Sequence, residues 1–233
     1  MSEKIIAFLP CRKGSERVKE KNTRPFAGNK HGLIEVKLQQ LMRCPDIAEI
    51  IVSSDDPVVR TLAKKASKRT DKLVHVLDRP ERLARSDTST DDLIQYIPEI
   101  VEDGNVLWTH VTAPFVDERV YSHAVKLFLS LSEKGENDSL MSVTRLQTFI
   151  WNQDGSLNYD RKKEKWPRTQ TLPLWYEINS AIFLAPITVY KDLLDRVGES
   201  PHLYEIDFPE SLDIDTENQF KLAEKVWNHV KKD

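Results

Sequence analysis

The stretch after the first apolar run of the chain concentrates cationic side chains. Six basic and two acidic residues lie between Arg12 and Arg24. Because like charges crowded into a loop repel one another, such a loop either stays solvated or binds an anion. Gly14 lets the backbone approach an anion, Ser15 adds a donor, and the Arg and Lys side chains supply charge-assisted hydrogen bonds. The position directly after a strand favours a polyphosphate site, although the Gly-Lys-Ser/Thr ending of a Walker loop is absent.

A pair of carboxylates follows much later in the chain. Asp213 and Asp215 project to the same face if their segment is extended, because side chains alternate along a strand. Two carboxylates on one face can hold Mg²⁺, which prefers oxygen ligands and bridges to substrate phosphates. The alternative is that an aspartate caps the following helix. Thr216 and Gln219 have the spacing of a capping box, which would leave both carboxylates free.

Two other polar stretches stand before expected helices. Asp56 precedes Pro57, a pattern that an N-cap aspartate with proline at the first helical position explains. Arg79 opens a second basic cluster, and the hydroxyls of Ser89 and Thr90 follow it. These hydroxyls either cap the next helix or contact a nucleotide.

Apolar runs of strand length alternate with amphipathic stretches along the chain. Strands are predicted at 5–9, 49–54, 73–77, 106–111, 139–145 and 180–186, with helices at 34–44, 57–69, 89–101, 117–132 and 216–232. The alternation predicts one α/β domain over residues 1–233, with a mainly parallel, Rossmann-like sheet and helices on both faces. Ligands bind at the carboxyl ends of such strands, where His110 and Thr112 end the fourth. A histidine there either contacts substrate or is structural.

Residues 146–178 break this rhythm. The segment concentrates aromatic bulk in Trp151, Tyr159, Trp166, Trp175 and Tyr176, and Asn-Gln-Asp-Gly at 152–155 indicates a hairpin with an Asp-Gly turn. So many aromatic residues are unusual in a solvated loop. We expect an arm that packs either on a second subunit or on its own core.

The composition excludes several classes of protein. A net charge of −3 argues against a general nucleic-acid binder. Cys11 and Cys44 are the only cysteines, and their spacing fits neither a metal site nor a disulfide framework. No apolar run approaches about 20 residues, so no membrane span is expected, and the apolar run at 5–9 is too short for a secretory signal. We expect a cytoplasmic protein.

Six blocks of the sequence, in the right order, resemble the acylneuraminate cytidylyltransferase family, the CMP-sugar synthetases that activate sialic acid and related ulosonic acids. The resemblance covers nearly the whole chain. Arg12, Gly14, Ser15, Lys21 and Asn22 are similar to the family signature Ala-Arg-x-Gly-Ser-x-x-x-x-x-Lys-Asn. The other blocks are residues 52–56, 79–84, 112–115, 177–183 and 211–216. The fold that the resemblance implies is of the nucleotide-diphospho-sugar transferase type.

The resemblance implies a Mg²⁺-dependent reaction in which the anomeric hydroxyl of an acidic sugar attacks the α-phosphorus of CTP and releases pyrophosphate. Arg12, Lys21 and Asp213 are then catalytic, mainly through positioning and charge neutralisation. Asp213 and Asp215 hold Mg²⁺, and Asp213 is the candidate general base. The residues implied in nucleotide binding are Arg12, Gly14, Ser15, Lys21, Asn22, Arg79, Ser89 and Thr90.

The implied sugar-binding residues are His110, Thr112, Arg168 and Asn179. Arg168 lies in a segment similar to the family's Pro-Arg-x-x-Leu-Pro, and its guanidinium can pair with the sugar carboxylate in a bidentate manner. In the family the arm belongs to a dimer partner, so a homodimer is expected.

The sequence departs from the family pattern near the sugar. The family often has glutamine at the position of His110 and arginine at that of Val116, and a lysine often seen on the arm has no clear counterpart here. The sugar is therefore left open between a sialic acid-like nonulosonate and an octulosonate. Two rival functions are a nucleotidyltransferase that uses another nucleotide or a sugar phosphate, and a non-catalytic CTP-binding module. The paired carboxylates argue against the second.

Overall fold

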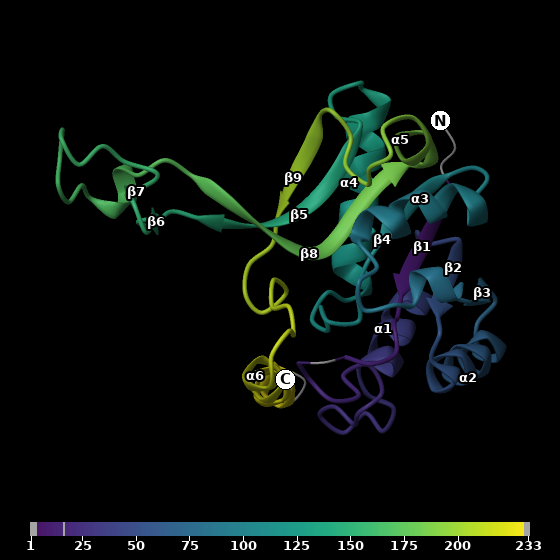
Figure 1. The fold of residues 1–233 in the computed structure, drawn as a ribbon. Coiled ribbons are helices and arrows are strands. Elements are labelled where there is room, and N and C mark those ends of the chain that lie inside the picture. The colour runs from purple at the N-terminus through teal and green to yellow at the C-terminus, as the bar shows by residue number, and fades with distance from the viewer. Residues whose placement is uncertain (1–3, 16, 231–233) are drawn as a thin grey trace.

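A seven-stranded sheet forms the centre of the molecule (Figure 1), which is a computed structural model that describes residues 4–15 and 17–230. The strand order is β3-β2-β1-β4-β8-β5-β9. The strands are β1 (Ile5–Pro10), β2 (Glu49–Ser54), β3 (Leu73–Asp78), β4 (Asn105–Trp108), β5 (Ser139–Leu146), β8 (Trp175–Pro186) and β9 (Pro201–Glu205). Of these seven, only β8 runs antiparallel to its neighbours. The predicted mainly parallel sheet is confirmed.

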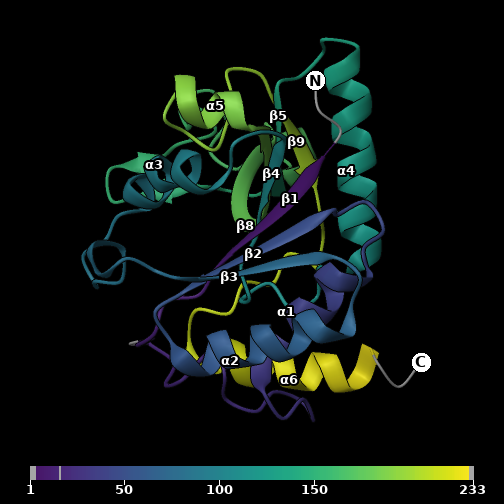
Figure 2. The ribbon, with the colours of Figure 1, turned by 90° about the vertical axis from the view of Figure 1, so that its right-hand side faces the viewer.

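Helices cover both faces of the sheet (Figure 2). One face carries α1 (Gly32–Arg43), α2 (Pro57–Ala66), α4 (Glu118–Glu133) and α6 (Glu217–Val230), and the other carries α3 (Thr90–Ile100) and α5 (Ile187–Asp192). β1 shows why both faces need cover. Ile5, Ala7 and Leu9 are buried in one apolar cluster, whereas Ile6 and Phe8 are buried in the other. Side chains alternate along a strand, so an unbroken apolar run supplies both cores.

Side-chain caps fix the helix ends where the sequence predicts them. The Asp56 carboxylate accepts from the Val58 amide at 2.8 Å. Ser89 caps α3 in a reciprocal capping box with Asp92. Thr216 and Gln219 bond each other's backbone amides ahead of α6, at 2.8 Å and 3.3 Å. Because Thr216 takes the capping role, the carboxylates before it are left for other partners.

Several predicted boundaries were wrong. β4 ends at Trp108 and not at residue 111. The next residue, Thr109, donates its hydroxyl to the carbonyl of Ala181, 2.8 Å away. α2 ends at Ala66 and passes into a 3-10 turn, Ser67–Arg69. α6 is described to Val230, so the predicted end at 232 lies outside the described residues. Phe220 and Ala223 are the buried residues of this helix, whereas Val230 is 47% exposed.

β5 and β8 continue beyond the sheet as a two-stranded ribbon, which carries the segment 146–178 away from the body of the molecule (Figure 1). Its tip holds a second, small sheet of β6 (Trp151–Asn152) and β7 (Gly155–Ser156) and a 3-10 turn at Thr169–Thr171. The predicted hairpin is confirmed, since Asn152 accepts from the amides of Asp154 and Gly155. The alternative that the arm packs on its own core was wrong.

The arm leaves the sheet at a bulge. Four residues of β8, 179–182, stand opposite the single residue Ser142 of β5. The Ser142 hydroxyl accepts a hydrogen bond from the Ile182 backbone amide at 2.8 Å and donates one to the side-chain oxygen of Asn179 at 2.6 Å. Ser180 takes a positive φ of 58° there, a conformation in which a residue with a Cβ is strained. The bulge therefore re-aims the two strands at a local conformational cost.

No helix in the described part of the chain combines the length and the apolar character that a membrane span requires.

Candidate functional site

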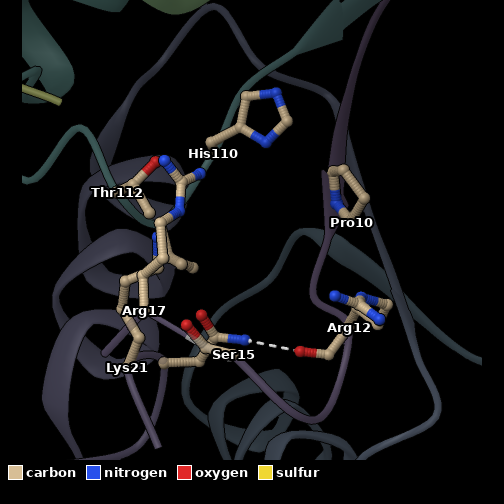
Figure 3. Close-up of a pocket in the computed structure, with 9 residues that line it drawn as sticks. Pro10, Arg12, Ser15, Arg17, Lys21, His110 and Thr112 are labelled. Carbon is tan, nitrogen blue, oxygen red and sulfur yellow. Dashed lines mark hydrogen bonds between the residues drawn. The ribbon is translucent and has the colours of Figure 1, made fainter. Parts of the chain in front are cut away.

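A cavity of about 380 Å³ opens at the carboxyl edge of β1 and β4. Its walls come from the loop after β1, with Pro10, Arg12, Ser15, Arg17, Lys21 and Asn22, and from the segment after β4, with His110, Val111 and Thr112. Figure 3 shows Pro10 and Arg12 on one side and His110, Thr112 and Arg17 on the other. The edge is the one that a parallel sheet offers to ligands, and the wall carries three cations.

Hydrogen bonds from neighbouring elements hold the cationic loop in shape. The Asn22 amide group donates to the Arg12 carbonyl at 3.1 Å, as drawn in Figure 3. Asp55 accepts from the backbone amide of Lys13 at 2.7 Å, so this carboxylate anchors the loop. Gly14 has a φ of 78° and nothing within 4 Å of the place a Cβ would take, so it turns the chain beside an open approach.

The acidic segment before α6 lies against the same loop. The Lys21 ammonium donates to the Ile214 carbonyl at 2.8 Å and stands 3.4 Å from the Asp215 carboxylate. Arg17 reaches the same oxygen of Asp215 at 3.2 Å. The structure thus brings together the basic and acidic stretches that the sequence singled out.

Asp213 is half-buried at this junction, and one of its two carboxylate oxygens is fully buried. Its Oδ1 makes no hydrogen bond among the described residues. Burial raises the pKa of Asp213, and the neighbouring charge of Asp215 raises it further. A buried carboxylate oxygen without a donor suits a cation, so the pair fits the Mg²⁺ that was predicted from sequence. No cluster of three or more His, Cys, Asp or Glu is gathered as a metal site in the described residues, so other ligands would be phosphate oxygens and water.

His110 presents a neutral donor to the cavity. The Trp108 indole Nε1–H donates to His110 Nε2 at 3.0 Å. An indole nitrogen can only donate, so Nε2 must be the unprotonated nitrogen and Nδ1 must carry the proton. Burial, and then the charge of Arg196, lowers the pKa of His110 to about 3. His110 is therefore a fixed hydrogen-bond donor near neutral pH and not a base.

A buried lysine holds the segment that carries His110 and Thr112. The Lys37 ammonium of α1 contacts the carbonyls of Ala113 and Val116 and the hydroxyl of Tyr121, at 2.7–3.0 Å. Tyr121 in turn lies 2.7 Å from the hydroxyl of Thr109. Because the Thr109 proton goes to the Ala181 carbonyl, Tyr121 must donate to Thr109 and accept from Lys37. All three bonds of Lys37 are then donated, which requires the charged form, although burial lowers its pKa.

Other predicted nucleotide contacts have structural partners in this structure. Arg79 is buried and donates to the Ser53 carbonyl at 2.9 Å. Ser89 caps α3, and Thr90 is the first residue of that helix. None of the three lines the cavity, so their roles toward the nucleotide stay predictions.

Two predicted sugar contacts also lie apart from the cavity wall. The Asn179 amide is engaged at both ends, by the hydroxyl of Ser142 at 2.6 Å and that of Thr144 at 3.2 Å. Arg168 is exposed on the arm, which extends away from the body of the molecule (Figure 1). Within one chain, therefore, neither side chain lines the cavity.

Sequence reasoning missed Arg17 and Lys37. Arg17 lies in the basic loop, but its residue type alone did not distinguish it from Lys13 or Lys19. Lys37 did leave a signal, because it stands between Ile34 and Leu41 on a helix face that is otherwise apolar. A lysine on a buried helix face destabilises the fold unless its ammonium is hydrogen-bonded, for example to buried carbonyls.

Solved structures confirm the fold. The structure of CMP:2-keto-3-deoxy-manno-octonic acid synthetase complexed with CTP aligns with a TM-score of 0.65 and 14% identity, covering 97% of this chain and 99% of that one. The 4-diphosphocytidyl-2C-methyl-D-erythritol synthase of Anaerococcus prevotii aligns with a TM-score of 0.64 and 14% identity, covering 99% and 96%.

Curated relatives and a family profile add sequence similarity. The N-acylneuraminate cytidylyltransferase of Escherichia coli O18:K1:H7 is 28% identical over 96% of this chain, which spans about half (52%) of that protein. The pseudaminic acid cytidylyltransferase of Campylobacter jejuni (strain 81-176) is 23% identical over 97% of this chain and 98% of its own. The CMP-N,N'-diacetyllegionaminic acid synthase of Legionella pneumophila is 27% identical over 96% of both. The profile described as Cytidylyltransferase matches residues 6–231, and the chain belongs to the cytidylyltransferase family.

Proposed function

We propose that this protein transfers CMP from CTP to an acidic ulosonic sugar and releases pyrophosphate. The observation that carries the proposal is the cationic cavity at the carboxyl edge of the sheet, joined through Lys21 to the acidic segment 213–215. Cationic donors suit a triphosphate, and a carboxylate pair suits the metal that accompanies it. Three relatives bear the names of enzymes for acidic sugars, and one structural neighbour was solved with CTP.

In this proposal the residues act mainly by position and charge. Arg12 and Lys21 hold the triphosphate, with Ser15 and Asn22 beside them. Asp213 and Asp215 hold Mg²⁺, which supplies neutralisation of the charge that develops on the phosphates. Lys21 already bonds the carbonyl between the two aspartates, so it fixes where they lie relative to the phosphates.

The sugar lies on the His110 side of the cavity in this proposal. The Nδ1–H of His110 donates to an oxygen of the sugar, a role for which the amide of a glutamine is also suited. Thr112 lies beside His110 on the same wall. Arg168 comes from the arm of a second subunit and pairs with the sugar carboxylate.

A homodimer through the arm is supported by the surface of the arm itself. Trp166, Leu174 and Ile178 are 66%, 47% and 52% exposed, and Trp175 and Tyr176 are 40% and 38% exposed. Aromatic residues are enriched at protein interfaces. A ribbon that leaves its own domain exposes both of its faces, and a second copy would cover them.

Pyrophosphate release measured over a matrix of substrates tests the proposal. Each of the four nucleoside triphosphates is paired with N-acetylneuraminic, pseudaminic, N,N'-diacetyllegionaminic and 2-keto-3-deoxy-manno-octonic acids, with Mg²⁺ or with excess chelator. We expect release with CTP and at least one acid, and none with chelator. Preference for another nucleotide would support the rival transferase. CTP binding without release for every acid would support a binding module.

A further inference from the structure

Arg196 carries a guanidinium that lies on aromatic rings and not on an acceptor. It follows α5, and its Cζ stands 3.6 Å from the ring centre of Phe183 and 5.1 Å from that of Trp108. Phe183 and Trp108 are paired across β8 and β4, so together they form one aromatic platform on the sheet. Cation–π contact stabilises the charge of a guanidinium but leaves its N–H donors unused.

Those donors have no protein acceptor. Among the described residues, the guanidinium of Arg196 has no hydrogen bond and no ion pair, although Asp195 and Asp91 lie close enough to influence its charge. The nearby hydroxyl of Tyr190 is buried and also lacks a partner. Arg196 is half-buried, and burial lowers its pKa. Two neighbouring polar groups that are both unsatisfied need an explanation, and a ligand is one.

The platform adjoins the cavity. Trp108, on which Arg196 lies, bonds His110 at 3.0 Å, and His110 lines the cavity wall. Among the charged groups near His110, Arg196 contributes most to lowering the pKa of that ring, ahead of Lys21, Lys37 and Arg79. Arg196 is thus a cation close to His110, although its own side chain is not among those that line the cavity.

We propose that Arg196 is a specificity-determining residue whose guanidinium binds an acceptor oxygen of the acidic sugar, either its carboxylate or a hydroxyl or acyl oxygen. The inference rests on the proposed function and deepens it. A planar guanidinium that is already held against the ring of Phe183 loses little freedom when it binds, and its fork of donors matches a pair of oxygens. In this proposal both side chains donate hydrogen bonds to the sugar, His110 as a neutral donor and Arg196 as a charged donor.

Steady-state kinetics of Arg196→Met and Arg196→Lys test the proposal, with the acid that wild type uses best in the panel above. Methionine keeps the apolar stem on the aromatic platform, and lysine keeps the charge without the planar fork. The matched control is Arg82→Met, which removes a guanidinium that lies 5.8 Å from the Tyr96 ring and outside the cavity. We expect Arg196→Met to raise the sugar KM roughly 10- to 100-fold and to change the CTP KM less than about twofold. Arg196→Lys should fall between wild type and Arg196→Met, and the control should match wild type.

The carboxamide of the same sugar identifies the oxygen that is bound. If Arg196 binds the carboxylate, wild type prefers the acid to the amide and Arg196→Met loses most of that preference. If it binds another oxygen, the sugar KM rises equally for acid and amide. An unchanged sugar KM, or equal increases for sugar and CTP with a lower melting temperature, would overturn the proposal and leave Arg196 as a packing residue. Failure of wild type to use any acid would instead contradict the proposed function, and this inference with it.

Discussion

Replacing His110 with glutamine should make the stability of the protein less sensitive to acid. His110 is neutral in the folded state, where its pKa is lowered from 6.5 to about 3. The unfolded chain takes up a proton as the pH falls through about 6.5, whereas the folded protein does not until about pH 3. The contribution of His110 to the free energy of unfolding is therefore fully present above about pH 6.5 and decreases as the pH falls below that value. Glutamine can still accept from the Trp108 indole but does not titrate.

The magnitude follows from linkage. Each pH unit between the two pKa values costs about 1.4 kcal/mol, so wild type should lose about 2 kcal/mol more than His110→Gln between pH 7 and pH 5. Because His110 keeps some contact with solvent, 2 kcal/mol is an upper estimate. Groups that titrate in both proteins cancel in the difference.

Urea denaturation at pH 7, 6 and 5 measures this difference. His229→Gln is the control, because His229 is exposed on α6 and far along the helix from the cavity, and it should track wild type. If the unfolding free energies of wild type and His110→Gln fall in parallel between pH 7 and 5, His110 is not held neutral and the assigned tautomer is wrong.

Four further experiments have defined outcomes. Asp213→Asn should slow turnover at saturating Mg²⁺ and raise the melting temperature at pH 7, because it removes a buried charge whose pKa is raised; normal turnover would refute the metal role. Arg12→Ala and Lys21→Ala should weaken CTP roughly 10- to 100-fold and CMP less, by calorimetry; equal losses would show that the loop does not bind the outer phosphates. Ser180→Gly should gain about 0.5–1 kcal/mol in urea unfolding, because relief of the positive φ outweighs the added freedom of the unfolded chain; a loss would disprove strain at the bulge. Mixing Arg168→Ala with Asp213→Asn protein under subunit exchange should restore activity, since about half of the dimers are mixed and each then holds one intact site; no recovery, or a monomer by light scattering, would refute the shared site.

The fold was largely predictable because its elements are locally encoded. Apolar runs bounded by caps and turns place β1, β2 and α2 within a few residues of their observed limits. β4 was predicted too long, because Val111 is apolar but serves the loop after the strand, where it is buried at the cavity wall. Hydrophobicity reports burial and not hydrogen-bonding geometry, so it could not mark the end of that strand.

The candidate site was predictable where charge is clustered in sequence and not where it is gathered by the fold. The loop with Arg12 and the pair at Asp213 could be identified because like charges stand close together in the chain. Arg196 could not be identified in this way, because a single arginine in a polar stretch carries no signal until the fold places it on Phe183 and Trp108. Asn179 was singled out by the family resemblance, but the sequence could not show that both ends of its side-chain amide are hydrogen-bonded within the bulge.

The bond from Lys21 to Ile214 joins residues 193 positions apart, and the pair of Arg24 with Glu217 spans the same separation. During synthesis, every strand of the sheet precedes residue 214, so the sheet can form while the cationic loop still lacks its counter-charge. The loop gains its ion pairs with Asp215 and Glu217 only when the segment before α6 and the first turn of that helix dock on it. Contacts between residues so far apart in the chain tend to form late, so we expect the acidic segment to join the loop after the sheet has folded. If the carboxylates at 213 and 215 hold the metal as proposed, a chain that ends before residue 213 has the strands of the sheet but lacks the acidic half of the site.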